Sequence, residues 1–322
     1  MNVKSRARIG AVVGAAALAL GLLAVPASAD PATGDYRVLA GAGSDTTQDV
    51  LNGLGTAIDS GTLIASYDAT GPSPVKTRAT GCQIARPNGS SAGINALRNA
   101  VDNNTGCLDF ARSSRGVADS SSTDLTWIPF GKDAVTFAVR ADSALPTALT
   151  AAQLVSIYTC DTTTLNGVAL TPLLPQPGSG TRSYFLAQLG LTESTFGPCV
   201  DDTVQEHNGE ALDSAGDIAP YSIAQYIAQG NEIDGVADRR GSAVLGSVNG
   251  VAPQLADGTL NTAFPFNRDV YNVVPTAELT DPTIAAAFVG ATSKVCSQSA
   301  VINTYGFGTL AHCGDTSLKG ES

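Results

Sequence analysis

The chain has 322 residues, of which 43% are hydrophobic and only 15% charged, and its net charge is −11. This composition is typical of a globular protein and excludes a disordered tail or a coiled coil. An acidic chain with no run of Lys or Arg also argues against nucleic acid and anionic membranes as partners. The length suits two lobes of roughly 150 residues each.

The first 29 residues have the pattern of a secretory signal peptide. Three cations (Lys4, Arg6 and Arg8) precede an apolar stretch at 9–25, and an Ala-x-Ala site ends at Ala29. We expect cleavage after Ala29, which changes the net charge from −11 to −14 because the three cations are lost. A membrane anchor is the alternative, but the stretch is short and rich in Ala and Gly. Because the leader has no cysteine for a lipid anchor, the sequence predicts a freely secreted, extracellular protein.

All six cysteines lie beyond the leader. In an exported protein an even number indicates three disulfides, although six cysteines allow 15 pairings. Pairing of sequence neighbours predicts Cys82–Cys107, Cys160–Cys199 and Cys296–Cys313. A zinc site is the alternative, but the chain has no CxxC and its two histidines lack ligand spacing. We therefore expect neither a metal nor a cofactor.

In chain order, predicted strands alternate with predicted helices. Apolar runs predict strands at 36–39, 107–111, 134–139 and 270–274. Helical spacing of apolar residues predicts helices at 49–58, 94–101, 184–189 and 223–228, and a helix end at 154–158. Such alternation is typical of an α/β fold.

Four turns between these elements combine glycine with Ser or Thr, at 41–48, 88–93, 112–116 and 175–182. Glycine lets the backbone approach a ligand, and the unpaired N–H groups and dipole of a following helix favour an anion. For any single turn, a structural helix cap is the alternative. The segment Gly178–Arg182 is the most specific, because two glycines, two hydroxyls and a guanidinium exceed what a cap needs. None of the turns is a Walker loop or a Rossmann fingerprint.

The order of these motifs resembles that of phosphate-binding proteins of ABC transporters. The similar segments cover nearly all of the mature chain: 41–43, 89–93, 110–114, 154–158, 178–181 and 264–268, followed by Tyr271. The resemblance implies an α/β, two-lobed periplasmic-binding-protein fold (type II), with the ligand in a cleft between the lobes. The chain would cross between lobes near 128–131 and 264–266. Lobe 1 would comprise 30–128 plus 267–322 and lobe 2 would comprise 129–266, with each disulfide inside one lobe.

Carried over residue by residue, the resemblance places Ser90, Ser179, Gly180 and Thr181 at ligand-binding positions. Asp45 stands where the family has a threonine, Ser114 where it has the aspartate that accepts the phosphate proton, and Pro175 where it has an arginine. We therefore assign the acceptor to Asp45, so that Asp45→Asn should narrow the preference for phosphate over sulfate. Arg182 is the first candidate for the missing guanidinium, followed by Arg115, and Arg112 is a third. The full expected ligand-binding set is Ser44, Asp45, Thr46, Ser90, Ser113, Ser114, Arg115, Ser179, Gly180, Thr181 and Arg182.

The favoured function is a secreted, monomeric, non-enzymatic binding protein that captures phosphate or a similar oxyanion, with an ABC transporter permease as its partner. Two alternatives stay open. One is an extracellular interaction module whose small-ligand site is lost or altered. The other is a hydrolase that uses Ser179, but Pro177–Gly180 lacks the GxSxG elbow. Only two histidines could then act as a base, and His207 is expected in a loop.

Overall fold

The computed structural model describes residues 30–322, so the predicted signal peptide lies outside the described residues. The helices are α1 (Gln48–Ala57), α2 (Ser90–Asp102), α3 (Ala151–Tyr158), α4 (Gly180–Gln188), α5 (Ile223–Gly230), α6 (Pro282–Phe288) and α7 (Ser299–Thr304). Short 3-10 turns are η1 (Asp45–Thr47), η2 (Ile58–Gly61), η3 (Gly209–Ala211) and η4 (Thr276–Thr280). In the described part of the chain, no helix is both long and apolar enough to cross a membrane.

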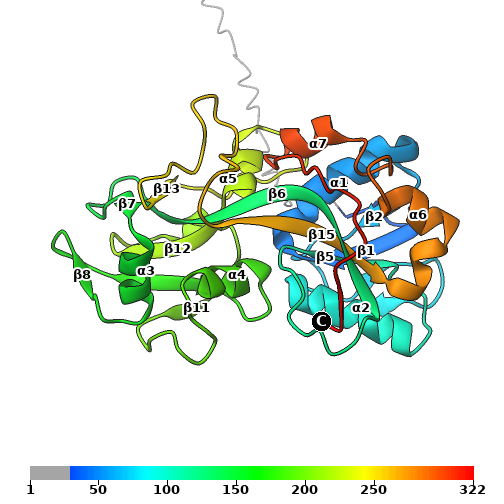
Figure 1. Cartoon of the computed structure of the whole chain (residues 1–322), viewed down its shortest axis with the longest axis horizontal. Coiled ribbons are helices and arrows are strands. Elements are labelled where there is room, and N and C mark those ends of the chain that lie inside the picture. Colours follow the sequence, from blue (N-terminus) through cyan, green and yellow to red (C-terminus); the bar gives the residue numbers. More distant parts are fainter. Residues whose placement is uncertain (1–29) are drawn as a thin grey trace, which may run out of the picture.

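One mixed sheet runs through the whole molecule (Figure 1). Its strands, in spatial order, are β11 (Asp201–Val204), β10 (Thr171–Pro175), β12 (Asp217–Ser222), β6 (Leu125–Arg140), β15 (Asn267–Pro275), β5 (Phe110–Ser113), β1 (Leu39–Gly43) and β2 (Ile64–Ser66). β13 (Ala243–Leu245) and β16 (Lys319–Gly320) also pair with β6. Three small two-stranded ladders lie apart: β3 (Val75–Lys76) with β4 (Gln83–Ile84), β7 (Ala148–Leu149) with β14 (Ser247–Val248), and β8 (Thr164–Leu165) with β9 (Val168–Ala169).

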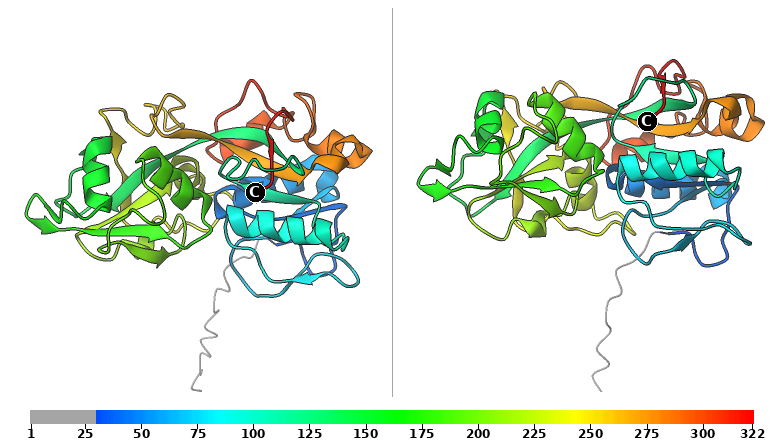
Figure 2. Two further views of the ribbon diagram at one scale, coloured as in Figure 1. Left: turned by 60° about the horizontal axis from the view of Figure 1, so that its bottom comes forward. Right: turned by 90° about the horizontal axis from the view of Figure 1, so that it is seen from below.

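The molecule has two lobes, which are seen from three directions in Figures 1 and 2. We call the lobe with β1, β2, β5, α1, α2, α6 and α7 lobe 1, and the lobe with β10–β13 and α3–α5 lobe 2. The long antiparallel strands β6 and β15 run through both lobes. We propose that the chain crosses between the lobes within these two strands, close to the boundaries that the sequence predicts at 128 and 267.

Each lobe has its own apolar core, and the periodicity noted in the sequence explains it. In lobe 1, Val50, Leu51 and Leu54 of α1 are fully buried and face the sheet. The ring of Phe110 on β5 packs against β1, where a Cβ on Gly41 would lie 2.2 Å from that ring. Glycine is therefore required at position 41 because the Phe110 ring occupies the space that a side chain would need. In lobe 2, Tyr158 and Phe185 meet edge to face at 5.1 Å between ring centroids.

Helix α5 joins the two cores. Ala224 and Ala228 belong to the core of lobe 1, whereas Ile223 and Ile227 belong to the core of lobe 2. Gly306 of lobe 1 lies so close that a Cβ there would be 2.5 Å from the carbonyl oxygen of Ala224. The lobes are thus in direct contact along α5 in this structure.

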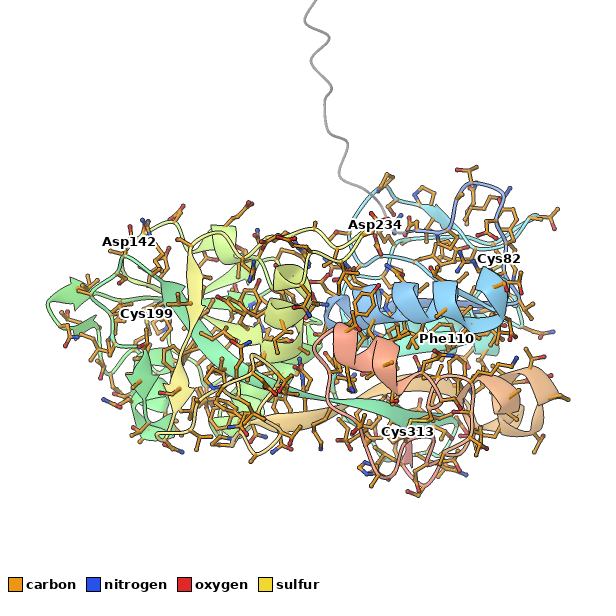
Figure 3. The ribbon with its side chains drawn as sticks, turned by 90° about the horizontal axis from the view of Figure 1, so that it is seen from above. Cys82, Phe110, Asp142, Cys199, Asp234 and Cys313 are labelled. Carbon is orange, nitrogen blue, oxygen red and sulfur yellow. A yellow bond between two sulfur atoms is a disulfide. The ribbon has the colours of Figure 1, made fainter. Side chains whose placement is uncertain are left out.

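The three predicted disulfides are confirmed. Cys82–Cys107, Cys160–Cys199 and Cys296–Cys313 are bonded, with sequence separations of 25, 39 and 17. Figure 3 shows Cys199 in lobe 2, far from Cys82 and Cys313 in lobe 1. Each bond therefore closes a loop within one lobe, for which chain entropy suggests a stabilisation of about 3–4 kcal/mol.

Candidate functional site

Six buried hydroxyls meet where the four glycine-rich turns come together. Ser44 and Thr46 follow β1, Ser90 begins α2 and Ser114 follows β5, all in lobe 1. Ser179 and Thr181 lie at the start of α4 in lobe 2. Every one of these six residues is fully buried. We call them the hydroxyl cluster.

Ser114 lies at the centre of the lobe 1 half of this cluster. Its Oγ accepts from Ser44 Oγ at 3.0 Å and from Thr46 Oγ1 at 3.2 Å, and it lies 3.3 Å from Ser90 Oγ. The backbone N–H of Ser114 donates to Ser90 Oγ at 3.0 Å. The Ser44 hydroxyl is not a helix cap, because Ser44 precedes η1 but makes no side-chain cap bond. Ser179 does cap α4, since its Oγ accepts from the N–H of Arg182 at 2.9 Å.

The two lobes come within hydrogen-bond distance at Thr46 and Thr181, whose Oγ1 atoms are 3.2 Å apart. Gly180 makes this approach possible. A Cβ at Gly180 would lie 2.3 Å from Ser90 Oγ and 2.4 Å from Ser114 Oγ. The turn of lobe 2 thus rests directly on the hydroxyls of lobe 1.

Arg268, near the start of β15, supplies a guanidinium to the cluster. Its Nη2 donates to Thr181 Oγ1 at 2.9 Å and to Thr46 Oγ1 at 3.4 Å. Its Nε and Nη2 also donate to the buried carboxylate of Asp133, at 3.0 and 2.8 Å. The remaining nitrogen, Nη1, is buried and has no hydrogen-bond partner among the described residues. Arg268 therefore keeps one donor free inside a buried site.

Glu206 and His207 complete the site from lobe 2. The Glu206 side chain is fully buried, and its Oε2 accepts from Thr46 Oγ1 at 3.3 Å. Burial raises the pKa of this carboxyl, but the hydrogen bond and electrostatic interaction with His207, the interaction with Ser179 and the charge of Arg268 together outweigh burial, so the pKa is lowered. Glu206 is thus held as a carboxylate. Its other oxygen, Oε1, is buried without a hydrogen-bond partner in the part of the chain that the structure describes.

A second charged group lies beside the cluster. The carboxylate of Asp45 is fully buried and lies 3.5 Å from Nη2 of Arg239, which belongs to lobe 2. One turn later on α1 is Asp49, whose pKa is raised to about 6 by burial and by the charge of Asp45, while Arg239 and Gln225 oppose the shift. Two buried carboxylates thus share one nearby arginine from the opposite lobe.

This arrangement predicts that stability depends on pH through Asp49. Because its pKa in the folded protein lies above the ordinary 3.8, folding binds a proton, and stability is lost as pH rises from about 4 through 6. Asp49→Asn removes this loss, so the variant should gain about 3 kcal/mol over wild type at pH 8 and little at pH 4. Urea unfolding of both proteins at the two pH values measures the difference. An equal difference at both values would contradict the assignment.

The structure places several of the predicted site residues elsewhere. Arg182 donates to Glu193 and Asp202, at 2.5 and 2.9 Å for Nη2, and to the carbonyl oxygen of Pro175 at 2.9 Å. Its guanidinium therefore lies within lobe 2 and not in the hydroxyl cluster. Ion pairs with acidic neighbours, which sequence order does not reveal, explain this orientation.

The other two candidate arginines and Ser113 have local partners. Arg115 donates to Ser91 Oγ and to the carbonyl of Gly116, and Ser113 Oγ donates to the carbonyl of Arg115. Arg112 is fully buried and donates to the carbonyl oxygen of Ser44 at 3.1 Å. Burial lowers the pKa of Arg112 to about 10. These side chains hold the turns of lobe 1 in place, but none of them forms a hydrogen bond with a side-chain hydroxyl of the cluster.

The sequence analysis did not select Arg268, Asp133, Glu206 or His207 for the site. Arg268 lies in the segment 264–268 that carried the family resemblance, and this was the available signal. The sequence predicts His207 only as a loop residue, and nothing in the spacing of Glu206 and His207 connects them to the four turns. In the described residues, no group of three His, Cys, Asp or Glu side chains could hold a metal ion.

The order of the elements and the two lobes define the fold. The fold is the two-lobed α/β fold of periplasmic binding proteins, with a polar cluster enclosed between the lobes. The chain matches no protein-family model and no curated protein.

Solved structures share this fold. A protein from Clostridium perfringens, assigned as a phosphate ABC transporter substrate-binding protein with bound phosphate, aligns with a TM-score of 0.59 at 15% identity, over 84% of this chain and 99% of that one. An ABC-type phosphate transport receptor from Vibrio cholerae gives 0.57 at 19% identity, over 84% and 100%. A phosphate-binding protein from Stenotrophomonas maltophilia gives 0.50 at 12% identity, over 85% and 91%. This chain is therefore similar in fold to substrate-binding proteins of transporters.

Proposed function

We propose that the protein is a secreted solute-binding protein that captures phosphate or a similar protonated oxyanion in the hydroxyl cluster. One observation carries the proposal: among residues 30–322, two buried side-chain atoms of the site have no hydrogen-bond partner, the donor Arg268 Nη1 and the acceptor Glu206 Oε1. Both side chains reach the same hydroxyl, Thr46 Oγ1. A buried polar atom without a partner is costly, so the pair favours a ligand that both accepts and donates. A phosphate that carries a proton does both.

The charge balance of the site supports a small, partly protonated anion. Asp133 already neutralises Arg268, and the Glu206 carboxylate adds a negative charge. Binding would therefore depend on hydrogen bonds from hydroxyls and a guanidinium more than on net positive charge. This is consistent with an acidic protein that still binds an anion, because surface charge is screened within about 8–10 Å.

Export and delivery belong to the same proposal. Three disulfides are expected in a protein of an oxidising compartment, which supports the predicted signal peptide. The solved structures of similar fold are described as parts of phosphate transporters. We propose that this protein passes its ligand to an ABC transporter permease. We further propose that it acts as a monomer.

Titration calorimetry with phosphate, sulfate, arsenate and nitrate tests the proposal. We expect phosphate and arsenate to bind and sulfate to bind at least tenfold more weakly, because sulfate has no proton to donate to Glu206. Binding of none of these anions would refute the oxyanion site and would favour an interaction module without a small ligand.

A substitution that adds a methyl group between the lobes provides an independent test. Gly180→Ala places a methyl group against Ser90 Oγ and Ser114 Oγ, which are firmly held in lobe 1. We expect the variant to fold but to lose about tenfold or more in phosphate affinity, because the lobes no longer close fully. Gly116→Ala is the matched control, since its new methyl group would meet only Tyr271 Oη at 3.9 Å. Equal affinities of the two variants would argue against binding between the lobes.

The geometry does not favour a serine hydrolase. In a Ser–His–acid triad, the imidazole takes the proton of the nucleophile on one nitrogen and donates to a carboxylate from the other. Here Nδ1 of His207 accepts from the backbone N–H of Ser222 at 3.2 Å, and Nε2 faces hydroxyls and Glu206. The acid and the hydroxyls thus both lie at Nε2, and no carboxylate is bonded to Nδ1, as a triad would require.

A further inference from the structure

His207 lies at the point where lobe 2 meets Thr46 of lobe 1. Its side chain is fully buried. Nε2 lies 3.0 Å from Thr46 Oγ1, 3.2 Å from Glu206 Oε2 and 3.4 Å from Thr181 Oγ1. The ring therefore faces the same hydroxyl that Arg268 and Glu206 reach.

The other ring nitrogen determines where the proton sits. Nδ1 is 3.2 Å from the backbone nitrogen of Ser222, which begins the turn into α5. A backbone N–H can only donate, so Nδ1 must present its lone pair. In the neutral imidazole the single proton is then on Nε2, because the bond at one nitrogen sets the state of the other. Nε2–H is directed into the hydroxyl cluster.

The backbone around His207 holds this orientation. His207 adopts a left-handed conformation with φ of 52°. Its carbonyl oxygen accepts from Tyr221 Oη at 2.7 Å and from Gln229 Nε2 at 3.0 Å. The Tyr221 ring also packs against the imidazole, with 5.5 Å between ring centroids. A non-glycine residue in this conformation is uncommon, and here two side-chain donors and a ring fix it.

From this geometry we propose that His207 is a ligand-binding residue of the site: its Nε2–H, held in one tautomer by Ser222, donates to an oxygen of the bound oxyanion. The inference rests on the proposed function. Because His207 belongs to lobe 2 and Thr46 to lobe 1, this donor reaches the ligand only when the lobes are closed.

The tautomer can be read directly by NMR. The chain contains only two histidines, His207 and His312, so ¹⁵N-histidine labelling gives two imidazoles. His312 is half exposed and pairs with Asp269, and His312→Gln removes its signals and assigns the remainder to His207. We expect His207 to carry its proton on Nε2 alone. A proton on Nδ1, in the other tautomer or in a doubly protonated ring, overturns the proposal.

Two substitutions of His207 distinguish the roles of its two ring nitrogens. In His207→Asn the amide takes the place of Nδ1 and nothing replaces Nε2, whereas in His207→Gln the longer amide can donate where Nε2–H does. Asparagine also tolerates the left-handed conformation well, so His207→Asn should fold. By calorimetry with inorganic phosphate, we expect about a tenfold to hundredfold loss for His207→Asn and a clearly smaller loss for His207→Gln. His312→Gln serves as the control and should match wild type.

The outcomes separate this inference from the proposed function. If wild type binds phosphate and His207→Asn binds it equally well, His207 is no ligand donor and the oxyanion site still stands. If wild type binds no phosphate, the proposed function fails together with the donor role, whatever the tautomer. If neither variant folds, titration of labelled wild type with inorganic phosphate decides the proposal: a shift of the His207 Nε2–H signal supports it, and an unchanged signal at saturation overturns it.

Discussion

Arg268→Ala is expected to lower the affinity for phosphate by about a hundredfold and to destabilise the protein by about 3–5 kcal/mol. The affinity falls because a charge-assisted donor inside a buried site is lost, and such bonds are worth about 1.5–3 kcal/mol each. The stability falls because the fully buried Asp133 carboxylate loses Arg268, its oppositely charged partner. Calorimetry and urea unfolding measure the two effects separately.

A double variant distinguishes binding from folding. Arg268→Ala with Asp133→Asn removes the uncompensated charge, and the asparagine oxygen can still accept from Ser222 Oγ and the N–H of Ala224, as Asp133 does now. We expect much of the lost stability to return and the affinity to remain low. Recovery of phosphate affinity in the double variant would show that Arg268 acts only by supporting the fold.

Glu206→Gln is expected to narrow the preference for phosphate over sulfate by about tenfold to a hundredfold, mainly through better sulfate binding. The Glu206 carboxylate can accept a hydrogen bond from the protonated oxygen of phosphate. Sulfate has no proton to donate, so the carboxylate repels it and neither negative charge gains a partner. Glutamine has nearly the same shape, and its amide can donate to sulfate. Competitive calorimetry with the two anions gives the selectivity of each variant.

Asp45→Asn is the matched comparison, because Asp45 is also fully buried and is the acceptor that the sequence predicts. Its carboxylate lies against Arg239, and no hydrogen bond joins it to the described hydroxyls of the cluster. We therefore expect Asp45→Asn to leave the selectivity nearly unchanged. If Asp45→Asn narrows the preference for phosphate over sulfate and Glu206→Gln does not, Asp45 is the acceptor, as the sequence predicts, and the proposal that Glu206 is the acceptor is wrong.

Features that depend on neighbouring residues could be predicted from the sequence. The strand at 134–139 lies within β6, the helix at 223–228 within α5, and the strand at 270–274 within β15, because apolar spacing reflects which face of an element is buried. The disulfides follow sequence order, since each closes a short loop inside one lobe. The glycine-rich turns were recognisable in part, because a turn's conformation depends on residues that are adjacent in the chain. The strand predicted at 36–39 begins only at Leu39, and Gly41–Gly43 belong to β1 and not to a turn.

The partners of the charged side chains could not be predicted in the same way. Arg182 directly follows the most specific turn, yet it lies against Glu193 and Asp202. The guanidinium that does reach Thr181 is Arg268, 87 residues further along the chain. A long side chain can turn to either side of its helix, and the carboxylate or hydroxyl it finds there depends on how distant segments pack.

The sequence by itself thus determined the α/β class, the disulfide pairs and the four turns that supply the hydroxyls. The tertiary structure decided which ionisable groups join them: Arg268 with Asp133 from β15 and β6, and Glu206 with His207 from the segment after β11. The physical reason is the range of the interactions. Backbone conformation and apolar periodicity are local, whereas a buried charge is stable only beside a partner that the fold brings from far away in the chain.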